Sequence, residues 1–500
     1  MLERAGQLMP DKWRRSDWMI SFVLFFGLST LFYATTSGIT SSNDGSHYAL
    51  ARTLIENHTF TLNQFDDYAE GNDIAITPDG RLFSDRPPGT ALLTTLFYKS
   101  GDWLPPPLTL LPSRHDADNA HLAYVMLLPV LAGAGTAVLL YAFSRFVGVS
   151  QPGALTAVLF FALGTVQWKY SSVLFSHALS GFLIAASLYL VVRMGQNRGG
   201  TWQQALLLGL LLGFSVLVEY SNALLVLIIL GYLLWSLRPF HIRHTVTIMG
   251  IAGAGGLISA IFLGFYNQVN FGTPFTLSYA YAVNYPWAGQ FGTTFSYPLL
   301  AGLRALLYFG EGGGWCDPVC YNQGLLLLSP VLIVAIPGTY FYWKQAKTVC
   351  LLTTAVFLTY LLLFAKHHTS HGFTGDGRYL LPFLGLMVMP MGAALDRLYA
   401  WTKRPLLQAL TFLIVYALFF LSVRNQILHI GRSYNYNLDL NQLDTLIVRP
   451  QNWVYLINTV LRNQANLPLL WALLGLILLG GLLIWGIHNA RKRPSNITWH

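Results

Sequence analysis

The sequence LPLLWALLGLILLGGLLIWGI, from Leu467 to Ile487, contains no charged residue and is long enough to cross a lipid bilayer as a helix. Uncharged runs of the same character extend from Leu206 to Leu217 and from Ala223 to Trp235. The strands of a membrane barrel would alternate apolar and polar residues, whereas these runs are continuously apolar. A helix satisfies its own backbone hydrogen bonds in lipid. The sequence therefore predicts an all-α polytopic membrane protein.

The composition of the whole chain agrees with this class. Hydrophobic residues make up 54% of the 500 residues and charged residues only 10%, whereas soluble domains carry about 25% charged residues. The net charge of +9 does not indicate a nucleic-acid partner, because Lys and Arg in a membrane protein chiefly mark its cytoplasmic side. The three cysteines indicate no disulfide framework.

Stretches of spanning length predict about twelve transmembrane helices. They lie near residues 18–37, 121–144, 152–168, 172–192, 203–219, 221–237, 246–266, 324–343, 348–365, 379–396, 405–423 and 467–488. With both termini on one face, that face holds 17 of the 30 Lys and Arg but only four of the 21 acidic residues. The positive-inside rule therefore predicts that both termini are cytoplasmic. Residues 1–17 are polar and basic, so the first apolar stretch is expected to remain as a signal anchor.

The long loops are then exoplasmic and belong to a single integral membrane domain over residues 1–500. They cover about residues 38–120, 267–323, 366–378 and 424–466. The first loop contains apolar residues at helical spacing from Tyr48 to Ile55, with Arg52 and Glu56 on the opposite face. We expect this amphipathic helix, and a second apolar run over Thr90–Tyr98, to lie along the membrane surface.

Two residues of the first loop have side chains suited to catalysis. Asp44 follows the first span and is either a helix N-cap or a general base, and the two roles are compatible. Arg86 precedes Pro87 and Pro88, and it is either an ordinary loop charge or a phosphate ligand held by a rigid turn. The planar guanidinium matches phosphate oxygens bidentately. Asp85 is expected to orient Arg86 or to contribute a second carboxylate.

Further ionisable residues lie at the ends of other predicted spans. Arg378 and Tyr379 start a late helix, so Arg378 is either an interfacial snorkelling residue or a second phosphate ligand. Lys169 and His177 flank a short exoplasmic loop, and His177 is expected slightly within the membrane, where an ionisable group is costly. Glu219 is either a satisfied polar group between helices or a second acid of the site.

Three other patterns contain residue types that occur in metal, disulfide or phosphate sites. His367, His368 and His371 have no partner acid or cysteine at a recognisable spacing, so solvated loop histidines are expected rather than a metal site. Cys316 and Cys320 share one loop, where an exoplasmic disulfide and free thiols are equally consistent with the sequence. The Gly-rich stretch around Glu311 lacks the strand–turn–helix context of a phosphate loop.

A set of short motifs in a fixed order resembles a known family. The motifs are Asn43–Tyr48, Asp85–Gly89, Tyr266–Asn267 with Phe271–Pro274, Gly324–Leu326 with Ser329–Pro330, and Gly377–Pro382. Over roughly residues 18–400 they are similar to bacterial members of the protein O-mannosyltransferase and lipid A aminoarabinose transferase superfamily. The resemblance implies the GT-C glycosyltransferase fold and an inverting transfer of sugar from a polyprenyl-phosphate carrier at the exoplasmic face.

The resemblance also implies roles for individual residues. Asp44 corresponds to the proposed base, Arg86 to the carrier-phosphate ligand, and Arg378 with Tyr379 to a second part of that site. Many relatives carry a second acid beside the first one or in the short second exoplasmic loop. This chain has Asn43 at the first position and no acid within residues 166–177, so Glu219 is the candidate, followed by Asp85.

The main functional prediction is therefore a glycosyltransferase, either hexosyl or pentosyl, acting on a lipid, glycan or protein hydroxyl. No cofactor is required, and a divalent cation is optional because arginines can supply the countercharge to the phosphate. The alternative is a transporter or flippase of lipid-linked saccharides. That alternative predicts charged residues near the middle of the membrane and inverted repeats, whereas nearly all the ionisable groups cluster at exoplasmic helix ends and the sequence shows no internal repeat. A non-catalytic scaffold gives no reason for Asp44 and Arg86 to face one cavity.

Overall fold

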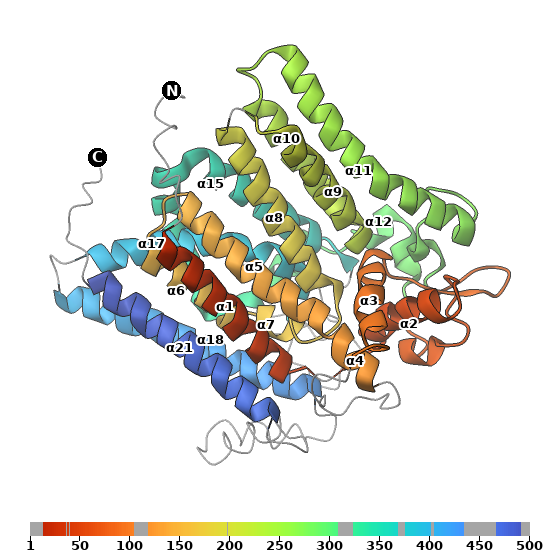
Figure 1. Cartoon of the computed structure of the whole chain (residues 1–500), viewed down its shortest axis with the longest axis horizontal. Coiled ribbons are helices and arrows are strands. Elements are labelled where there is room, and N and C mark those ends of the chain that lie inside the picture. The colour runs from red at the N-terminus through yellow and green to blue at the C-terminus, as the bar shows by residue number, and fades with distance from the viewer. Residues whose placement is uncertain are drawn as a thin grey trace.

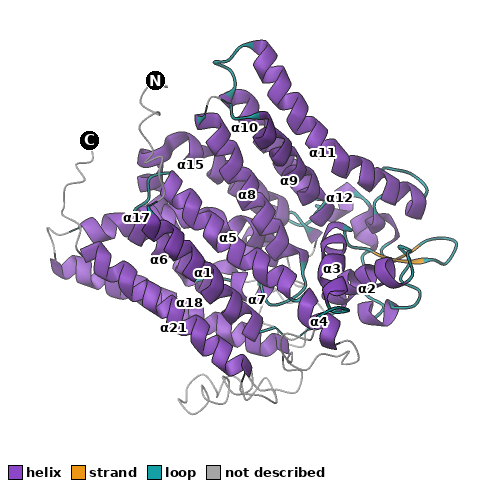
Figure 2. Cartoon of the chain, viewed as in Figure 1, coloured by secondary structure: helices purple, strands orange, loops and turns teal. Residues whose placement is uncertain are grey.

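The computed structural model describes residues 14–36, 38–39, 41–104, 119–197, 199–308, 324–368, 376–401, 405–434 and 467–491. The described chain is almost entirely helical, with one small pair of strands (Figure 2). Each of the twelve predicted spans coincides with helical structure. The all-α membrane class predicted from the sequence is confirmed. His371, Glu311, Cys316 and Cys320 lie outside the described residues, and so does most of the predicted loop over 424–466.

The long helices lie side by side as a bundle (Figure 1). Their bounds, with those of the short helix α4 that leads into α5, are α1 Arg15–Ala34, α4 Asn119–Val125, α5 Leu127–Phe146, α6 Gln151–Gly164, α8 Ser176–Gln196, α9 Trp202–Val218, α10 Asn222–Ser236, α11 Ile242–Phe271, α15 Ala335–Ala365, α17 Val388–Ala400, α18 Pro405–Tyr434 and α21 Leu467–Arg491. The shorter helices are α2 Ser42–Glu56, α3 Gly89–Ser100, α7 Gln167–Tyr170, α12 Phe291–Thr294, α13 Leu299–Leu307, α14 Leu325–Leu328 and α16 Leu381–Leu384. Single 3-10 turns are η2 Asp66–Ala69, η4 Ser278–Tyr281, η5 Pro286–Gly289, η6 Pro330–Val334, η8 Arg378–Leu380 and η9 Gly385–Met387.

The number of helices of full spanning length differs from the expected twelve. Seven helical segments of the described chain are long and apolar enough to cross a membrane, and the helices at 151–164, 202–218, 222–236 and 473–486 are apolar but shorter. The two spans expected at 324–343 and 348–365 form one segment, Pro330–Ala365. Its backbone leaves the helical region at Ala346, between Lys344 and Lys347, so α15 is kinked there.

Close helix contacts depend on glycine at a few positions. Gly27 of α1 packs against Leu479 of α21, and Gly475 of α21 packs against Leu31 of α1, so these two helices run antiparallel. The start of α1 and the end of α21 therefore lie at the same end of the bundle. Gly209 of α9 lies directly against the Ala252 carbonyl group of α11, where a Cβ atom would collide with backbone.

The segment after α1 folds into α2, a hairpin and α3. Strands β1 Ile74–Ile76 and β2 Leu82–Ser84 pair antiparallel, with Ile74 opposite Ser84. The predicted amphipathic helix is present as α2, but Tyr48 and Leu50 are fully buried. Protein rather than lipid therefore covers the apolar face of α2. The hydroxyl of Ser46 donates to the Asp73 carbonyl oxygen at 2.7 Å and joins α2 to the hairpin.

Candidate functional site

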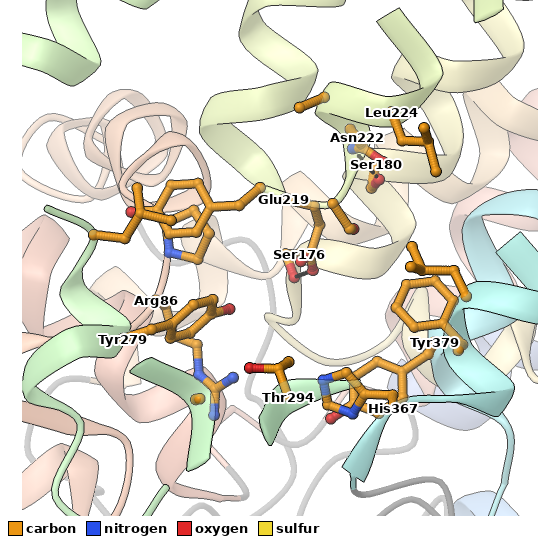
Figure 3. Close-up of a pocket in the computed structure, with 18 of the residues that line it drawn as sticks. Arg86, Ser176, Ser180, Glu219, Asn222, Leu224, Tyr279, Thr294, His367 and Tyr379 are labelled. Carbon is orange, nitrogen blue, oxygen red and sulfur yellow. Dashed lines mark hydrogen bonds between the residues drawn. The ribbon is translucent and has the colours of Figure 1, made fainter. Parts of the chain in front are cut away.

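A cavity of about 540 Å³ lies where the first loop meets the ends of several bundle helices. Its walls come from the segment before α3, the start of α8, the turn between α9 and α10, residues 277–295, the end of α15 and the segment that begins at Arg378. Figure 3 shows Arg86 beside Tyr279 on one side of this cavity, His367 and Tyr379 on the other, and Glu219 between them. Segments far apart in the sequence thus form a single cavity.

Arg86 is held in place by acidic and amide groups. It forms an ion pair with Asp73, and its Nε atom lies 3.2 Å from Asp85 Oδ1. In the amide orientation that satisfies both partners, Asn43 accepts hydrogen bonds from Nε and Nη2 of Arg86 at 3.2 and 3.3 Å. Asp85 therefore contacts Arg86, as expected, while the sequence had given no indication of Asp73.

The position of Arg86 relative to α9 follows from a glycine three residues later. A Cβ atom at Gly89 would lie 2.5 Å from the Leu217 carbonyl carbon, so only glycine allows α3 to start against the end of α9. Pro87 and Pro88 restrict the backbone between Arg86 and this contact. The sequence RPPG therefore holds the guanidinium near Glu219, which follows α9.

Glu219 is the one carboxylate among the described residues that line the cavity. It caps the C-terminus of α9 in an extended conformation, with φ −147° and ψ 116°. The hydroxyl of Ser176 donates to Glu219 Oε1, and His177 Nδ1 lies 3.2 Å from the same oxygen (Figure 3 shows the Ser176 contact). Both predicted residues, Glu219 and His177, thus belong to one hydrogen-bonded group in the cavity wall.

Arg378 and Tyr379 line the opposite part of the cavity, as predicted. Gly377 has a φ of +65°, and this left-handed turn starts the segment that carries both side chains. The Arg378 guanidinium lies 5.3 Å from the Phe175 ring centroid. Its Nε–H has no hydrogen-bond partner among the described residues, although the atom is buried. A buried guanidinium donor beside a cavity is suited to an anionic ligand.

Aromatic rings cover the wall around Tyr379. The Phe364 ring stacks on Tyr379 at 5.4 Å and 15°, and His367 lies 5.1 Å from Tyr379. Trp287 contacts His367 at 5.5 Å between ring centroids. Burial lowers the pKa of His367 to about 4, so this imidazole is neutral at physiological pH. These rings therefore form an uncharged aromatic surface beside Arg378, on which a sugar ring can stack.

Asp44 and Lys169 do not line the cavity, although Asn43 does. Asp44 is fully buried, and its Oδ1 atom accepts hydrogen bonds from the backbone N–H and hydroxyl of Ser41 at 2.7 and 2.8 Å. It is thus the acidic member of a capping box that starts α2. The expected helix cap is present, with Ser41 rather than Asp44 at the N-cap position.

Lys169 belongs to a second buried group behind Arg378. Asp376 Oδ2 accepts hydrogen bonds from the Tyr170 hydroxyl at 2.6 Å and from Lys169 Nζ at 3.3 Å, and it lies 2.9 Å from His429 Nε2. Asp376 Oδ1 accepts from the backbone N–H of Arg378 at 3.2 Å. Asp376 directly precedes the Gly377–Pro382 motif in the sequence. The sequence did not indicate that His429 would contact its carboxylate.

No group of three or more metal-ligating His, Cys, Asp or Glu side chains occurs within the part of the chain that the structure describes. His367 and His368 both contact Trp287, and the His368 ring lies 4.8 Å from the Trp287 ring.

Comparisons with known proteins give one match to a protein family. Residues 118–263 match the family model described as dolichyl-phosphate-mannose-protein mannosyltransferase. This match confirms the resemblance to this family, although the matched residues lie between the motifs at 85–89 and 266–274 and include none of them. No curated protein matches the sequence.

Two solved structures are similar to the chain at low identity. An oligosaccharyltransferase from Archaeoglobus fulgidus in the apo form shares 13% identity, with 87% of this chain and 60% of that chain covered and a TM-score of 0.46. ArnT from Cupriavidus metallidurans bound to undecaprenyl phosphate also shares 13% identity, with 94% and 77% covered and a TM-score of 0.49. The chain therefore spans about 60% of the length of the archaeal enzyme.

Proposed function

We propose that this protein is an inverting glycosyltransferase that moves a sugar from a polyprenyl-phosphate carrier to a hydroxyl acceptor at the exoplasmic membrane face. One observation carries the proposal above the others. Arg86 from the first loop and Arg378 from a late segment line the same cavity as Glu219. Two guanidinium groups and one carboxylate are the charges that a phosphate leaving group and a hydroxyl nucleophile require. The family match over residues 118–263 supports the same reaction class.

The reaction is a single displacement at the anomeric carbon of the donor sugar. The acceptor oxygen forms a bond to that carbon while the bond to the carrier phosphate oxygen breaks, and the phosphate leaves with the bonding electron pair. Arg86 and Arg378 stabilise the negative charge that develops on the phosphate. The acceptor proton passes to a carboxylate. Attack from the face opposite the leaving group inverts the anomeric configuration.

Glu219 is the better placed of the two candidate bases. Its side chain lines the cavity and contacts His177, which can help to hold the carboxylate in one orientation. Asp44 is fully buried and does not line the cavity. A base must come within hydrogen-bond distance of the proton it removes. We therefore assign the base to Glu219, and Asp44 supports the start of α2, which carries Asn43.

The exoplasmic location of the site rests on charge distribution and topology. The face that holds the ends at Arg15 and Arg491 has the greater share of Lys and Arg. The cavity lies at the other end of the bundle, beside the segment that follows α1. Outside the cell no nucleotide-sugar pool exists, so a donor anchored in the membrane fits this location. No metal or other cofactor is included in the proposed reaction.

The test uses the purified protein in liposomes with a panel of radiolabelled undecaprenyl-phosphate hexoses and pentoses. Acceptors come from an envelope extract, and release of undecaprenyl phosphate is measured with and without EDTA. We expect acceptor-dependent release that EDTA leaves unchanged. Glu219→Gln should lower kcat by about a hundredfold or more, while Asp44→Asn should lower it less and lower the melting temperature more.

Two results would contradict these assignments. A larger loss of kcat in Asp44→Asn than in Glu219→Gln, at equal folded fraction, would return the role of base to Asp44. Movement of the labelled lipid across the liposome bilayer with its sugar–phosphate bond intact would instead identify a flippase and reject the transferase.

A further inference from the structure

Aromatic side chains gather at the mouth of the candidate active site, in the loop that follows η4. Tyr285, Trp287, Phe291 and Phe295 all line this cavity. The Phe291 side chain is 77% exposed, so the cavity opens beside it, whereas the other three are only partly exposed. None of the four takes part in the phosphate contacts or the proton transfer described above.

The rings of this loop continue into the aromatic wall beside Arg378. Phe295 lies 4.8 Å from Phe291 and 5.6 Å from His367, measured between ring centroids. His367 in turn contacts Tyr379, which follows Arg378 in the chain. A row of rings therefore leads from the mouth of the cavity to one of the two arginines.

A second row of contacts leads from the same loop to the other arginine. Trp287 lies 5.5 Å from His367 and 5.7 Å from Tyr285 between ring centroids. The Arg86 guanidinium lies 5.9 Å from the centre of the Tyr285 ring. The loop thus presents one aromatic surface that is open to solvent at one end and reaches both proposed phosphate ligands.

Hydrogen bonds hold the loop in place without a ligand. The hydroxyls of Thr293 and Thr294 both donate to the Trp287 carbonyl oxygen, at 2.6 and 3.1 Å. The backbone N–H of Tyr297 donates to the carbonyl oxygen of Lys366, just after α15, at 3.0 Å. A binding surface that is already ordered loses less conformational entropy when its ligand arrives.

Two polar groups on these rings are available to a ligand. Within the described chain, neither the indole N–H of Trp287 nor the hydroxyl of Tyr285 has a hydrogen-bond partner. A sugar ring has an apolar C–H face that can lie on an aromatic ring and hydroxyls at its edge that can pair with such groups. A hydrocarbon chain would cover the same rings and leave both groups unpaired, which costs free energy. The surface therefore favours a carbohydrate over a lipid chain.

A peptide acceptor has less to bind to beside this cavity. Extended peptides commonly add a strand to an open sheet edge, and the described chain has one sheet, β1 with β2. On the outer side of β1, Ala75 forms a bridge with Ala282. On the outer side of β2, the backbone N–H of Leu62 donates to the Leu82 carbonyl oxygen at 2.8 Å. Both edges of this sheet are thus partly covered by the protein itself.

We propose that this aromatic surface binds a carbohydrate acceptor, so that the hydroxyl that receives the donor sugar belongs to a glycan. The inference rests on the proposed function, because it names the acceptor class of that reaction. One sugar ring of the glycan lies on Trp287 and directs a hydroxyl into the cavity that Glu219 lines. The acceptor oxygen bonds to the anomeric carbon of the donor while its proton passes to Glu219. The remaining units of the glycan leave the cavity past Phe291.

The experiment identifies the acceptor class and the residue that binds it. Acceptors from an envelope extract are treated with periodate, which cleaves sugar diols, with a protease, or with chloroform and methanol to separate free lipids. Transfer from the labelled undecaprenyl-phosphate sugars is then measured in liposomes with wild type, Trp287→Ala and Trp287→Phe. Trp103→Ala is the matched control, because Trp103 is an 81% exposed tryptophan that does not line the cavity. Binding of undecaprenyl phosphate, measured by native mass spectrometry, reports whether each variant keeps a folded donor site.

We expect periodate to abolish acceptor activity and the protease to leave it intact. Trp287→Ala should raise KM for the acceptor about tenfold, with the donor KM and the binding of undecaprenyl phosphate unchanged. Trp287→Phe should have a smaller effect, because it keeps a ring and loses only the N–H group. Trp103→Ala should match the wild type.

Three results would overturn the acceptor assignment while leaving the transferase intact. Acceptor activity that resists periodate and is lost with the protease would identify a peptide, and activity that enters the lipid extract and resists periodate would identify a lipid. A rise in donor KM as large as that in acceptor KM for Trp287→Ala would assign the ring to the donor sugar. If the wild type transfers no sugar, the proposed function fails. The aromatic surface is then tested by binding alone, and its assignment fails if Trp287→Ala retains the glycan fraction of the extract as well as the wild type does.

Discussion

The hydroxyl of Tyr170 donates a 2.6 Å hydrogen bond to Asp376 Oδ2, joining the short helix α7 to the segment that ends in Arg378. The same carboxylate accepts from Lys169, and its other oxygen accepts from the backbone N–H of Arg378. Burial alone would raise the pKa of Asp376, but the Lys169 ammonium and His429 lower it well below its usual range. A buried carboxylate thus fixes the backbone of a cavity arginine.

The first prediction concerns Asp376→Asn. Removing the carboxylate leaves the largely buried Lys169 ammonium without its hydrogen-bonded anion, which should lower the free energy of unfolding by about 3 kcal/mol. Among molecules that fold, KM for the donor should rise and kcat should change less, because the segment before Arg378 loses its ion pair with Lys169 while the base is intact. Asp102→Asn, which breaks an exposed pair with Lys99, should cost at most about 1 kcal/mol and leave KM unchanged. Equal effects of the two variants would argue against a positioning role.

The pH dependence of this group has a definite sign. Because the folded-state pKa of Asp376 is depressed, its stabilisation is present above the ordinary value of 3.8 and is lost only as the pH falls towards the lower folded value. The ionisation of Asp376 itself should therefore contribute a constant amount to the difference in unfolding free energy between wild type and Asp376→Asn from pH 5 to pH 8. Chemical denaturation in detergent at several pH values measures it.

A second prediction concerns Arg86→Lys. Arg86 contacts Asp85 and Asn43 through its guanidinium, and lysine cannot reproduce this planar set of donors. We expect kcat/KM for the donor to fall by about a hundredfold, since a phosphate-directed contact that strengthens in the transition state is lost. Arg52→Lys is the control, because Arg52 pairs with Glu56 on α2 and does not line the cavity. A loss of activity in Arg52→Lys as large as that in Arg86→Lys would contradict the assignment.

The sequence predicted the two arginines and the carboxylate that line the cavity more successfully than it predicted the residues that contact them. The sequence predicts Arg86 from the rigid Pro-Pro turn that follows it, and Glu219 and Arg378 from their places at exoplasmic helix ends. All three line one cavity. Asp44 and Asn43 are neighbours on one helix, so their side chains point about 100° apart. The sequence analysis predicted that Asp44 would face the cavity, whereas Asn43 lines it and Asp44 does not.

Other features depended on contacts between distant segments. Asp73 has ordinary loop neighbours, and His429 lies in a long apolar helix, so nothing local indicated that they would meet Arg86 and Asp376. The helices were predicted well because hydrophobic length is a local property. Near Ala346 the sequence predicted a boundary between two separate spans, and the structure shows a kink there within α15.

The third prediction uses the buried imidazole of His47. Both ring nitrogens of His47 lack a hydrogen-bond partner among the described residues, and burial together with the nearby Arg86 lowers its pKa to about 3. The unfolded chain, with a pKa near the ordinary 6.5, therefore binds a proton that the folded chain does not. The contribution of neutral His47 to the free energy of unfolding is complete above pH 6.5. It decreases as the pH falls towards 3, by up to about 1.4 kcal/mol per pH unit.

His47→Phe should flatten this dependence. We expect the melting temperature of the wild type in detergent to fall steadily between pH 7 and pH 4.5, and that of His47→Phe to change less over the same range. His241→Phe is the control, since His241 is exposed and precedes α11. If wild type and His47→Phe lose stability in parallel, the acid sensitivity arises elsewhere in the protein.

The last prediction concerns Gly377→Ala. Gly377 adopts a φ of +65°, a conformation that costs an L-residue roughly 1 to 2 kcal/mol, and an added Cβ would lie 3.0 Å from Leu325 Cγ. Because this turn orients Arg378, we expect a lower melting temperature together with a higher KM for the donor. Gly231→Ala is the control, because Gly231 lies within α10 and an added Cβ would have no other atom within 4 Å. This variant should leave the melting temperature and the donor KM unchanged, or raise the melting temperature slightly. A normal donor KM in Gly377→Ala would show that the turn serves stability alone, and the orientation of Arg378 would then depend on Asp376 and Tyr170.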